Sequence, residues 1–273
     1  MISGTQADSG TSLRTWAPPP FISNAGTRWA LYLGALVYLV LAIGSVEVNW
    51  ARMVLGLERG WAFVEGFLYP DFSSRWGDIA QGFQESLTMT VTSTALGVFL
   101  SIPVAVGASR NLAPTWIYLV CRAFIATSRT LNEIIVAIFL VAMFGFGPFA
   151  GFLTLTFATI GFMAKLMAED IEEIQASQLE ALRATGAGYL QVLDFAVLSQ
   201  VMPRLLGLSL YRLDINFRES AVIGIVGAGG IGATLNTAMD RYEFDSAAAI
   251  LWVIIVIVMF AEYSSGRLRK YIQ

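Results

Sequence analysis

Long apolar runs separated by short polar segments dominate the pattern of this 273-residue chain. An α-helix needs about 20 apolar residues to cross the hydrocarbon core of a bilayer, and a helix satisfies its backbone hydrogen bonds internally. The pattern therefore predicts an all-α integral membrane protein with about six transmembrane helices. The predicted spans are 29–46, 86–108, 115–146, 150–168, 205–226 and 246–263.

Charged residues interrupt the third predicted span. Arg122, Arg129 and Glu133 precede the apolar run Ile134–Phe146. A break at membrane depth is tolerated only where protein or water satisfies the exposed polar groups. Glu133 follows Arg129 by four residues, so a local ion pair is one explanation. The alternative is that Ser128, Arg129 and Glu133 form a secondary site on a transport path.

The remaining segments predict three further regions. Residues 1–27 are rich in Ser, Thr, Gly and Pro, which indicates a disordered cytoplasmic tail. Residues 28–84 combine the first span with an outer interfacial loop, where aromatic side chains alternate with charges. The rest, 85–270, forms the core domain, and its one long polar insertion, at about 171–204, predicts a cytoplasmic hairpin of two helices.

The hairpin has the features of a docking element. A strong helix-forming run ends at Gly186, a residue suited to a left-handed helix cap. Leu190, Leu193 and Val197 fall on one face of the second helix at helical spacing. The stretch 169–183 carries five acidic residues and one arginine, which disfavours adsorption to anionic lipid. A partner protein is therefore favoured over the membrane surface as the cover of this apolar face.

Four ionisable residues lie in the fifth predicted span. Asp214 and Arg218 are four residues apart and can pair on one helix face, whereas Arg212 is expected near the inner interface, where its guanidinium can snorkel to water. Charges in a span usually face a bundle interior or a water-filled cavity. Two interpretations stay open: a translocation pathway for an anion that includes Asp214, Arg218 and Glu219, or a structural ion pair.

The glycine-rich segment 227–232 matches the dinucleotide fingerprint G-x-G-x-x-G. That fingerprint needs a βαβ unit and an acidic residue about 20 positions further on, where this chain has Trp252 in an apolar span. We therefore expect no nucleotide here. Glycine permits close backbone approach, so the segment is predicted to be a packing or gating element, with Gly229 and Gly230 on the translocation pathway.

Composition and charge narrow the function further. Hydrophobic residues make up 56% of the chain and charged residues only 14%, well below the roughly 25% of a soluble domain. The net charge of −3 argues against nucleic acid as a partner. The chain has no histidine, one cysteine (Cys121) and no phosphate-binding P-loop motif, so we expect no metal site, no bound cofactor and no ATP hydrolysis by this chain alone.

Glu180-Ala181-Leu182, followed by Gly186 and later by Leu198, resembles the EAA loop of ABC importer permeases. Departures from the loop pattern occur at Leu182, Ala196 and Ser199. Four segments together resemble the phosphonate branch of these permeases over about residues 80–270. They are 110–114, 145–151, 180–187 and 226–232.

The resemblance implies a type I ABC importer permease fold and a non-enzymatic translocation subunit in a bacterial cytoplasmic membrane. It implies a homodimer, two ABC ATPase subunits that bind ATP with Mg, and an external substrate-binding protein. The residues expected to couple this chain to the ATPases are Glu180, Ala181, Gly186, Leu190 and Leu193. Positive charges beside the spans predict that both termini are cytoplasmic.

The substrate implied by the resemblance is a phosphonate, phosphite or related oxyanion. Methionine importer permeases share the fold and the glycine-rich turn, so methionine or another small solute is the first alternative. An ion-coupled secondary transporter, which needs no ATPase, is an alternative from another class. The exposed apolar face predicted for the hairpin argues against this last possibility.

Overall fold

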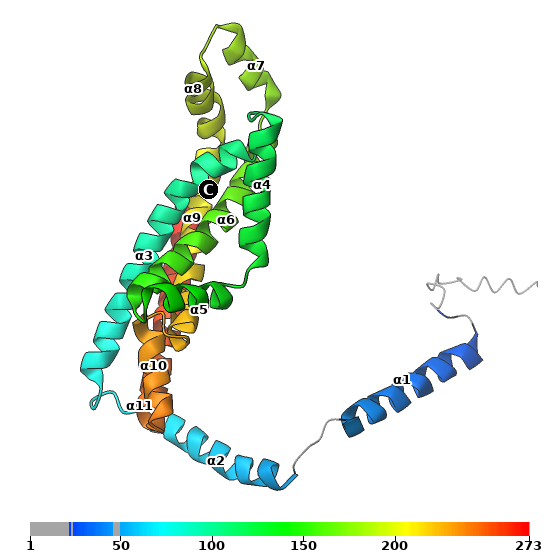
Figure 1. Cartoon of the computed structure of the whole chain (residues 1–273), viewed down its shortest axis with the longest axis vertical. Helices are drawn as coiled ribbons and strands as arrows, with labels where there is room; N and C mark the ends of the chain where they lie inside the picture. Colours follow the sequence, from blue (N-terminus) through cyan, green and yellow to red (C-terminus); the bar gives the residue numbers. More distant parts are fainter. Residues whose placement is uncertain (1–21, 23, 46–49, 273) are drawn as a thin grey trace, which may run out of the picture. The chain divides into compact units, whose positions relative to one another are not determined.

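The computed structural model describes residues 22, 24–45 and 50–272, and the described residues are helical with short connections (Figure 1). Residues 1–21 and 23, most of the predicted tail, lie outside this part. The chain divides into two units, 1–59 and 60–273. In the first unit, α1 (Ala25–Ser45) is apolar, has no buried residues and is long enough to cross a membrane.

The second unit is a bundle of long helices. Among the described residues, five helices of the chain are apolar and long enough to span a membrane, or six if a bent pair counts as one span, which confirms the prediction of about six. The helices after α1 are α2 (Trp50–Leu68), α3 (Trp76–Gly107), α4 (Thr115–Thr130), α5 (Glu133–Phe144), α6 (Pro148–Glu172), α7 (Ala176–Ala184), α8 (Tyr189–Val192), the π-helical turn η1 (Leu193–Leu198), α9 (Ser199–Ile225), α10 (Gly230–Asp240) and α11 (Phe244–Ile272).

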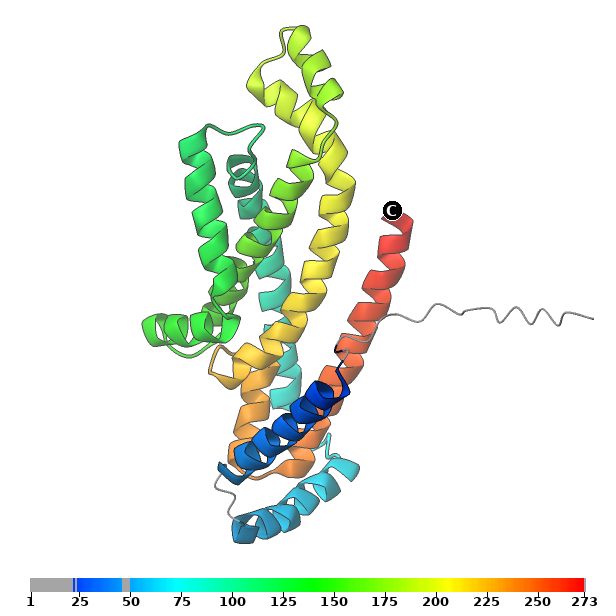
Figure 2. The ribbon, with the colours of Figure 1, turned by 90° about the vertical axis from the view of Figure 1, so that its right-hand side faces the viewer.

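Helices α3, α6 and α9 form the centre of the bundle and pack against one another (Figures 1 and 2). Small residues allow the close approach: a Cβ added at Gly97 of α3 would lie 2.6 Å from the side chain of Thr159 on α6. Burial of apolar side chains does not drive helix association in lipid, because the lipid tails are themselves apolar. Membrane helices therefore associate through close contacts at small residues such as these. Buried hydroxyls donate to carbonyls of their own helix, as Thr159 Oγ1 does to Leu155 at 2.6 Å.

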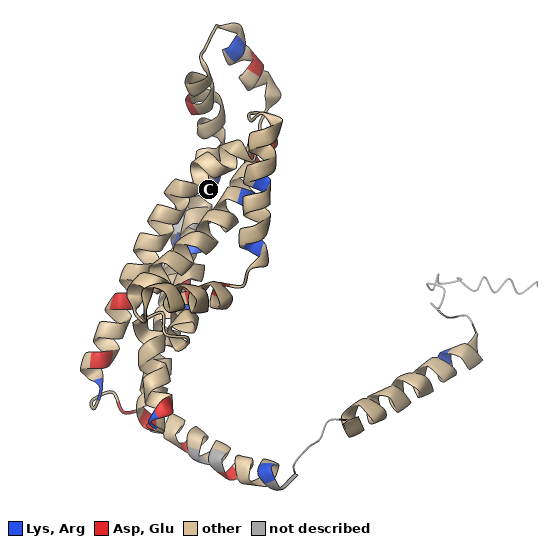
Figure 3. Cartoon of the chain, viewed as in Figure 1, with Lys and Arg blue, Asp and Glu red and all other residues tan. Residues whose placement is uncertain are grey.

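Charged residues are sparse along the middle of the bundle and more frequent towards its ends (Figure 3). One end holds the start of α3, where Arg75 Nε contacts Glu243 at 2.6 Å. Nearby, Asp71 accepts hydrogen bonds from the backbone and hydroxyl of Ser73 at 2.8 and 2.6 Å. The hydroxyl bond is the main cause that lowers the pKa of Asp71 to about 2.

The other end of the bundle carries the helical hairpin, α7 and α8 (Figure 1). The turn between α3 and α4 is tied to the end of α6 beside it. Arg110 N–H donates to Glu172 Oε1 at 2.8 Å, and Arg122 forms an ion pair with the same carboxylate at 2.9 Å. These contacts place a positively charged turn next to the base of the hairpin.

Candidate functional site: a polar pocket, a glycine turn and a helical hairpin

A sharp bend between α4 and α5 opens a polar pocket in the bundle. The two helices meet at 94°, because Leu131 is extended and Asn132 starts α5 by accepting the Ile134 N–H at 2.9 Å. The cavity has a volume of about 400 Å³. The break predicted in the third span is therefore confirmed, and it forms one wall of a cavity.

Arg212 lies buried at this pocket. Its side chain is 3% exposed, Nη2 lies 3.2 Å from Glu219 Oε2, and Nε donates to Thr159 Oγ1 at 3.2 Å. The prediction that Arg212 snorkels to the inner interface is wrong. Arginine at this position faces α6 in the middle of α9, where Glu219, two turns further along the same helix, neutralises its charge.

The ring of Phe162 on α6 contacts two guanidinium groups. Arg129 lies 5.4 Å and Arg212 5.2 Å from the ring centre, within the range of cation–π attraction. The local ion pair predicted between Arg129 and Glu133 does not form. A spacing of four residues brings side chains together only on a continuous helix, and here the chain bends between the two residues.

The polar pocket unites residues that the sequence placed in separate candidate sites. Ser128, Arg129 and Glu133 of the third span line it together with Glu219 of the fifth. Arg212, Asn132 and Phe162 also line it, although they had no predicted site role. A spacing of seven between Arg212 and Glu219 was the signal that could have linked them. The lining residues are Ser128, Arg129, Thr130, Leu131, Asn132, Glu133, Ala158, Phe162, Arg212, Ile215 and Glu219.

Asp214 and Arg218 lie apart from this pocket. They form the predicted pair, with Arg218 Nη2 and Asp214 Oδ2 separated by 3.2 Å. The Arg218 side chain is 54% exposed. Asp214 lines a different cavity, between α3, α9 and α11. Of Asp214, Arg218 and Glu219, the three ionisable residues of the fifth span predicted on the pathway, Glu219 alone lines the cavity that holds the arginines.

The glycine turn before α10 is packed so closely that side chains would not fit, which confirms the predicted close packing. Gly227, Gly229 and Gly230 have positive φ angles of 93°, 77° and 75°. A Cβ at Gly229 would lie 2.6 Å from the backbone nitrogen of Pro148. The Gly230 N–H donates to Glu85 Oε2 at 3.1 Å, so a side chain of α3 satisfies the first turn of α10.

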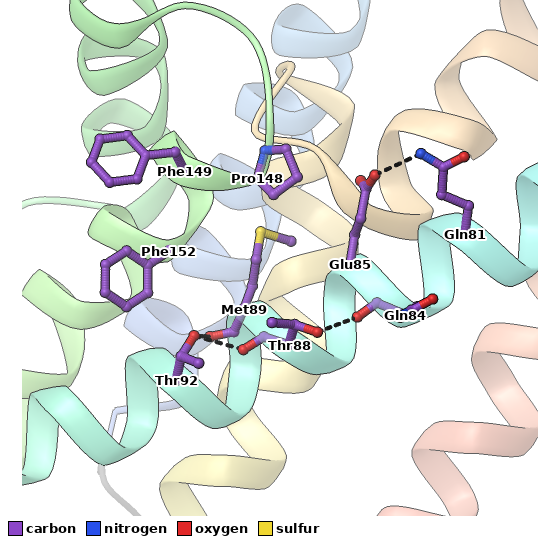
Figure 4. A pocket seen from close by; sticks show the side chains of 9 residues that line it. All are labelled: Gln81, Gln84, Glu85, Thr88, Met89, Thr92, Pro148, Phe149 and Phe152. Carbon is purple, nitrogen blue, oxygen red and sulfur yellow. Dashed lines mark hydrogen bonds between the residues drawn. The ribbon is translucent and has the colours of Figure 1, made fainter.

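A third cavity, of about 550 Å³, lies between α3 and α6 near this turn (Figure 4). Glutamine and threonine side chains of α3 face Phe149 and Phe152 of α6 across it. Glu85 is the single ionisable group among the described residues that line it, and it accepts a hydrogen bond from Gln81 Nε2 at 3.1 Å. This groove therefore lacks the positive charge that an anion requires.

The hairpin presents an exposed first helix and a capped turn. Glu180 and Ala181 on α7 are exposed. Gly186 has a φ of 79° and its N–H bonds to the Arg183 carbonyl at 3.0 Å, which confirms the predicted left-handed cap.

The face predicted for the second hairpin helix is wrong. Leu190 is 76% exposed, Leu193 is half-buried and Val197 is fully buried. The turn η1 is π-helical over 193–198, and its wider i→i+5 turn rotates the faces away from α-helical spacing. Val197 therefore packs into the core of the bundle, while Leu190 stays at the hairpin tip.

Residues 97–273 match the family described as "Binding-protein-dependent transport system inner membrane component". The chain belongs to this family. The match contains the hairpin, the glycine turn and every lining residue of the polar pocket. The protein is thus a multi-pass inner-membrane permease component of a binding-protein-dependent transport system.

Relatives and solved structures agree with this assignment. The chain is 39% identical to the phosphite transport system permease protein PtxC of Stutzerimonas stutzeri, over 90% of this chain and 91% of that protein. It is 42% identical to the phosphate-import permease protein PhnE of Mycolicibacterium smegmatis, over 74% of this chain and 38% of the relative. The MetNI methionine ABC transporter, in an inward-facing conformation, has the same fold, with a TM-score of 0.62 at 22% identity over 74% of this chain and 99% of that chain.

Proposed function

We propose that this permease component carries a phosphonate, phosphite or related oxyanion through the membrane in an ATP-driven importer. Relatives at 39% and 42% identity are named for phosphite and phosphate. The observation that carries the proposal is the pair of guanidinium groups, exposed Arg129 and buried Arg212, at one open cavity between α4, α5, α6 and α9. Arginine suits oxyanions because its planar donors match their geometry.

The importer would contain a second copy of this chain, two ABC ATPase subunits and an external substrate-binding protein. ATP with Mg would bind to the ATPases, and this chain would hold no cofactor and perform no catalysis. The support is membership of a binding-protein-dependent transport family and the likeness to an ABC transporter chain. ATP-driven closure of the ATPases would move the hairpin, and the spans would then alternate between outward and inward access.

The coupling residues would be Glu180, Ala181, Gly186, Leu190 and Leu193 of the hairpin. Tyr189 and Leu190 at its tip are 55% and 76% exposed, and such an apolar tip fits a groove on a partner protein. Both termini would be cytoplasmic, on the same side as the hairpin, because the positively charged turn at Arg110 lies beside the hairpin base.

Gly229 and Gly230 would belong to the pathway through the packing of their turn rather than through contact with solute. The pathway role of Asp214 and Arg218 stays a prediction, whereas Glu219, Ser128, Arg129 and Glu133 share one cavity.

Methionine import is the second candidate, because the MetNI transporter has the same fold. Uptake by the reconstituted complex separates the candidates. The purified permease, ATPases and binding protein would be placed in liposomes and supplied with phosphite, methylphosphonate, phosphate or methionine. We expect ATP-dependent uptake of at least one oxyanion and none of methionine. Uptake of methionine alone would refute the oxyanion proposal, and uptake by the lone permease under an ion gradient would refute the ATP-driven class.

A further inference from the structure

Two arginines from different helices, Arg129 and Arg212, line the polar pocket and contact the same ring of Phe162. We propose that this pocket binds the transported oxyanion in passage, with the guanidinium groups of Arg129 and Arg212 and the amide of Asn132 as its donors. The inference rests on the proposed function, which supplies the transport of an anion. The ligand class is a small tetrahedral oxyanion such as phosphite, a short phosphonate or phosphate.

Arg129 supplies the first argument. Its guanidinium contacts the Phe162 ring, and no carboxylate among the described residues lies within ion-pair distance of it. A charged group in a membrane-spanning bundle usually has a partner of opposite charge or faces a water-filled cavity. Arg129 has the cavity, so an anion that enters the pocket provides the missing counter-charge.

Arg212 supplies the second argument. Two of its nitrogens donate hydrogen bonds, Nε to Thr159 Oγ1 and Nη2 to Glu219 Oε2. The third nitrogen, Nη1, has no hydrogen bond to the described residues. Glu219 compensates the buried charge while the pocket is empty. The remaining donor can then bind an incoming oxyanion without a change in the fold, because the ring of Phe162 and Thr159 hold the guanidinium in place.

The other lining groups set the strength of binding. Asn132 uses its Oδ1 to cap α5, which leaves the amide NH₂ as a neutral donor. Glu133 and Glu219 oppose the two arginines in charge, so the empty pocket has no large excess of positive charge. The site is consequently weak, as transport requires, since a solute that binds too tightly is not released. A volume of about 400 Å³ lies in the range of small-molecule sites.

Protection of Arg129 from chemical modification tests this site directly. The permease–ATPase complex would be treated with phenylglyoxal, which reacts with guanidinium groups, in the presence of phosphite, phosphate, methionine or chloride. Mass spectrometry would then follow the adducts at Arg129 and at Arg218. We expect phosphite or phosphate to slow modification of Arg129 at least fivefold, and to leave Arg218 unaffected.

Uptake by variants provides the second readout. Arg129→Gln should lower oxyanion uptake at least tenfold, and Arg129→Lys should be intermediate because it keeps the charge but loses the planar fork. Lys165→Gln is the matched control, because Lys165 lies three residues after Phe162 on α6 and outside the lining of the pocket. The Lys165→Gln variant should take up oxyanion at the rate of the parent. Glu133→Gln should lower the phosphite concentration needed for protection, because it removes a like charge.

The outcomes separate the site from the proposed function. If oxyanions are taken up while Arg129 is neither protected nor needed, the site is wrong and the function stands. If the complex takes up methionine and no oxyanion, the function is wrong, and the anion site survives only if phosphite or phosphate still protects Arg129. Protection of Arg218 in place of Arg129 would overturn the site in favour of a path along the exposed side of α9.

Discussion

Arg212 and Glu219 stabilise each other inside the bundle, and neither charge would be tolerated there alone. Arg212 is 3% exposed and Glu219 25%. Removal of one partner of a buried pair leaves an uncompensated charge, which costs about 3–5 kcal/mol. We therefore expect Glu219→Ala to lower the thermal unfolding midpoint of the purified complex strongly, and Arg212→Met/Glu219→Ala to recover most of the loss. Equal midpoints for the single and double variants would show that the pair contributes little.

The pair of Asp214 and Arg218, in which the Arg218 side chain is 54% exposed and that of Asp214 only 11%, allows a contrasting prediction. If Arg218 only balances Asp214, loss of both charges leaves neither group without its partner on the helix. We expect Asp214→Asn/Arg218→Gln to assemble normally and to take up oxyanion within about twofold of the parent rate, because loss of both charges leaves no uncompensated charge in the span. Assembly and uptake must be measured separately, because a well-assembled double variant with poor uptake would assign Arg218 to the pathway.

At the scale of elements, the glycine turn packs against the start of α6 and positions α10 against α3 and α9. Gly229 has a φ of 77°, and its missing side chain leaves room for the backbone of Pro148. Gly229→Leu should therefore displace α10 and reduce uptake more than tenfold, because both the backbone conformation and the contact forbid a side chain. Gly77→Ala, in the first turn of α3 with no atom near its Cβ position, should behave like the parent. Normal uptake by Gly229→Leu would contradict the packing role, and binding of NAD by the permease alone would contradict the exclusion of nucleotide.

Gly186 in the hairpin turn allows the effect of backbone strain to be tested without a steric clash. No atom lies within 4 Å of a Cβ placed at Gly186, but its φ of 79° is unfavourable for other residues. Left-handed backbone costs a β-branched residue about 1–3 kcal/mol. We expect Gly186→Val to insert into the membrane normally but to lose most transport-linked ATP hydrolysis, whereas Gly188→Ala keeps it. Glu180→Ala should also reduce coupling without affecting insertion, and normal coupling in both variants would refute the assignment of the hairpin.

Sequence patterns predicted these elements unequally well, for physical reasons. The break before α5, the cap at Gly186 and the close glycine turn were predictable, because each depends on local backbone chemistry. The burial of Val197 was not, since the π-helical turn over 193–198 has no simple sequence signature and changes the register. The burial of Arg212 was also not predictable from local sequence, because it depends on contacts with Thr159 and Phe162, about 50 residues earlier in the chain.

At the scale of the whole molecule, the direction of the chain through the membrane connects the pocket to the hairpin. Helices α6 and α9 run from the hairpin to the polar pocket (Figure 2). A movement of the hairpin can therefore reach Phe162 and Arg212 through two continuous helices. This arrangement requires the hairpin to lie on the side of the ATPases and the start of α3 on the opposite side.

Labelling from one side of the membrane tests that orientation. In a Cys121→Ser background, Ser73→Cys reports on the start of α3 and Thr185→Cys on the hairpin, and both positions are exposed. We expect a membrane-impermeant maleimide to label Ser73→Cys in intact cells, because the turn would face outward. Thr185→Cys should react only after the membrane is permeabilised, since the positive-inside bias of the neighbouring Arg110 turn keeps this end in the cytoplasm. Labelling of Thr185→Cys in intact cells would reverse the orientation and remove the hairpin from the reach of an ATPase.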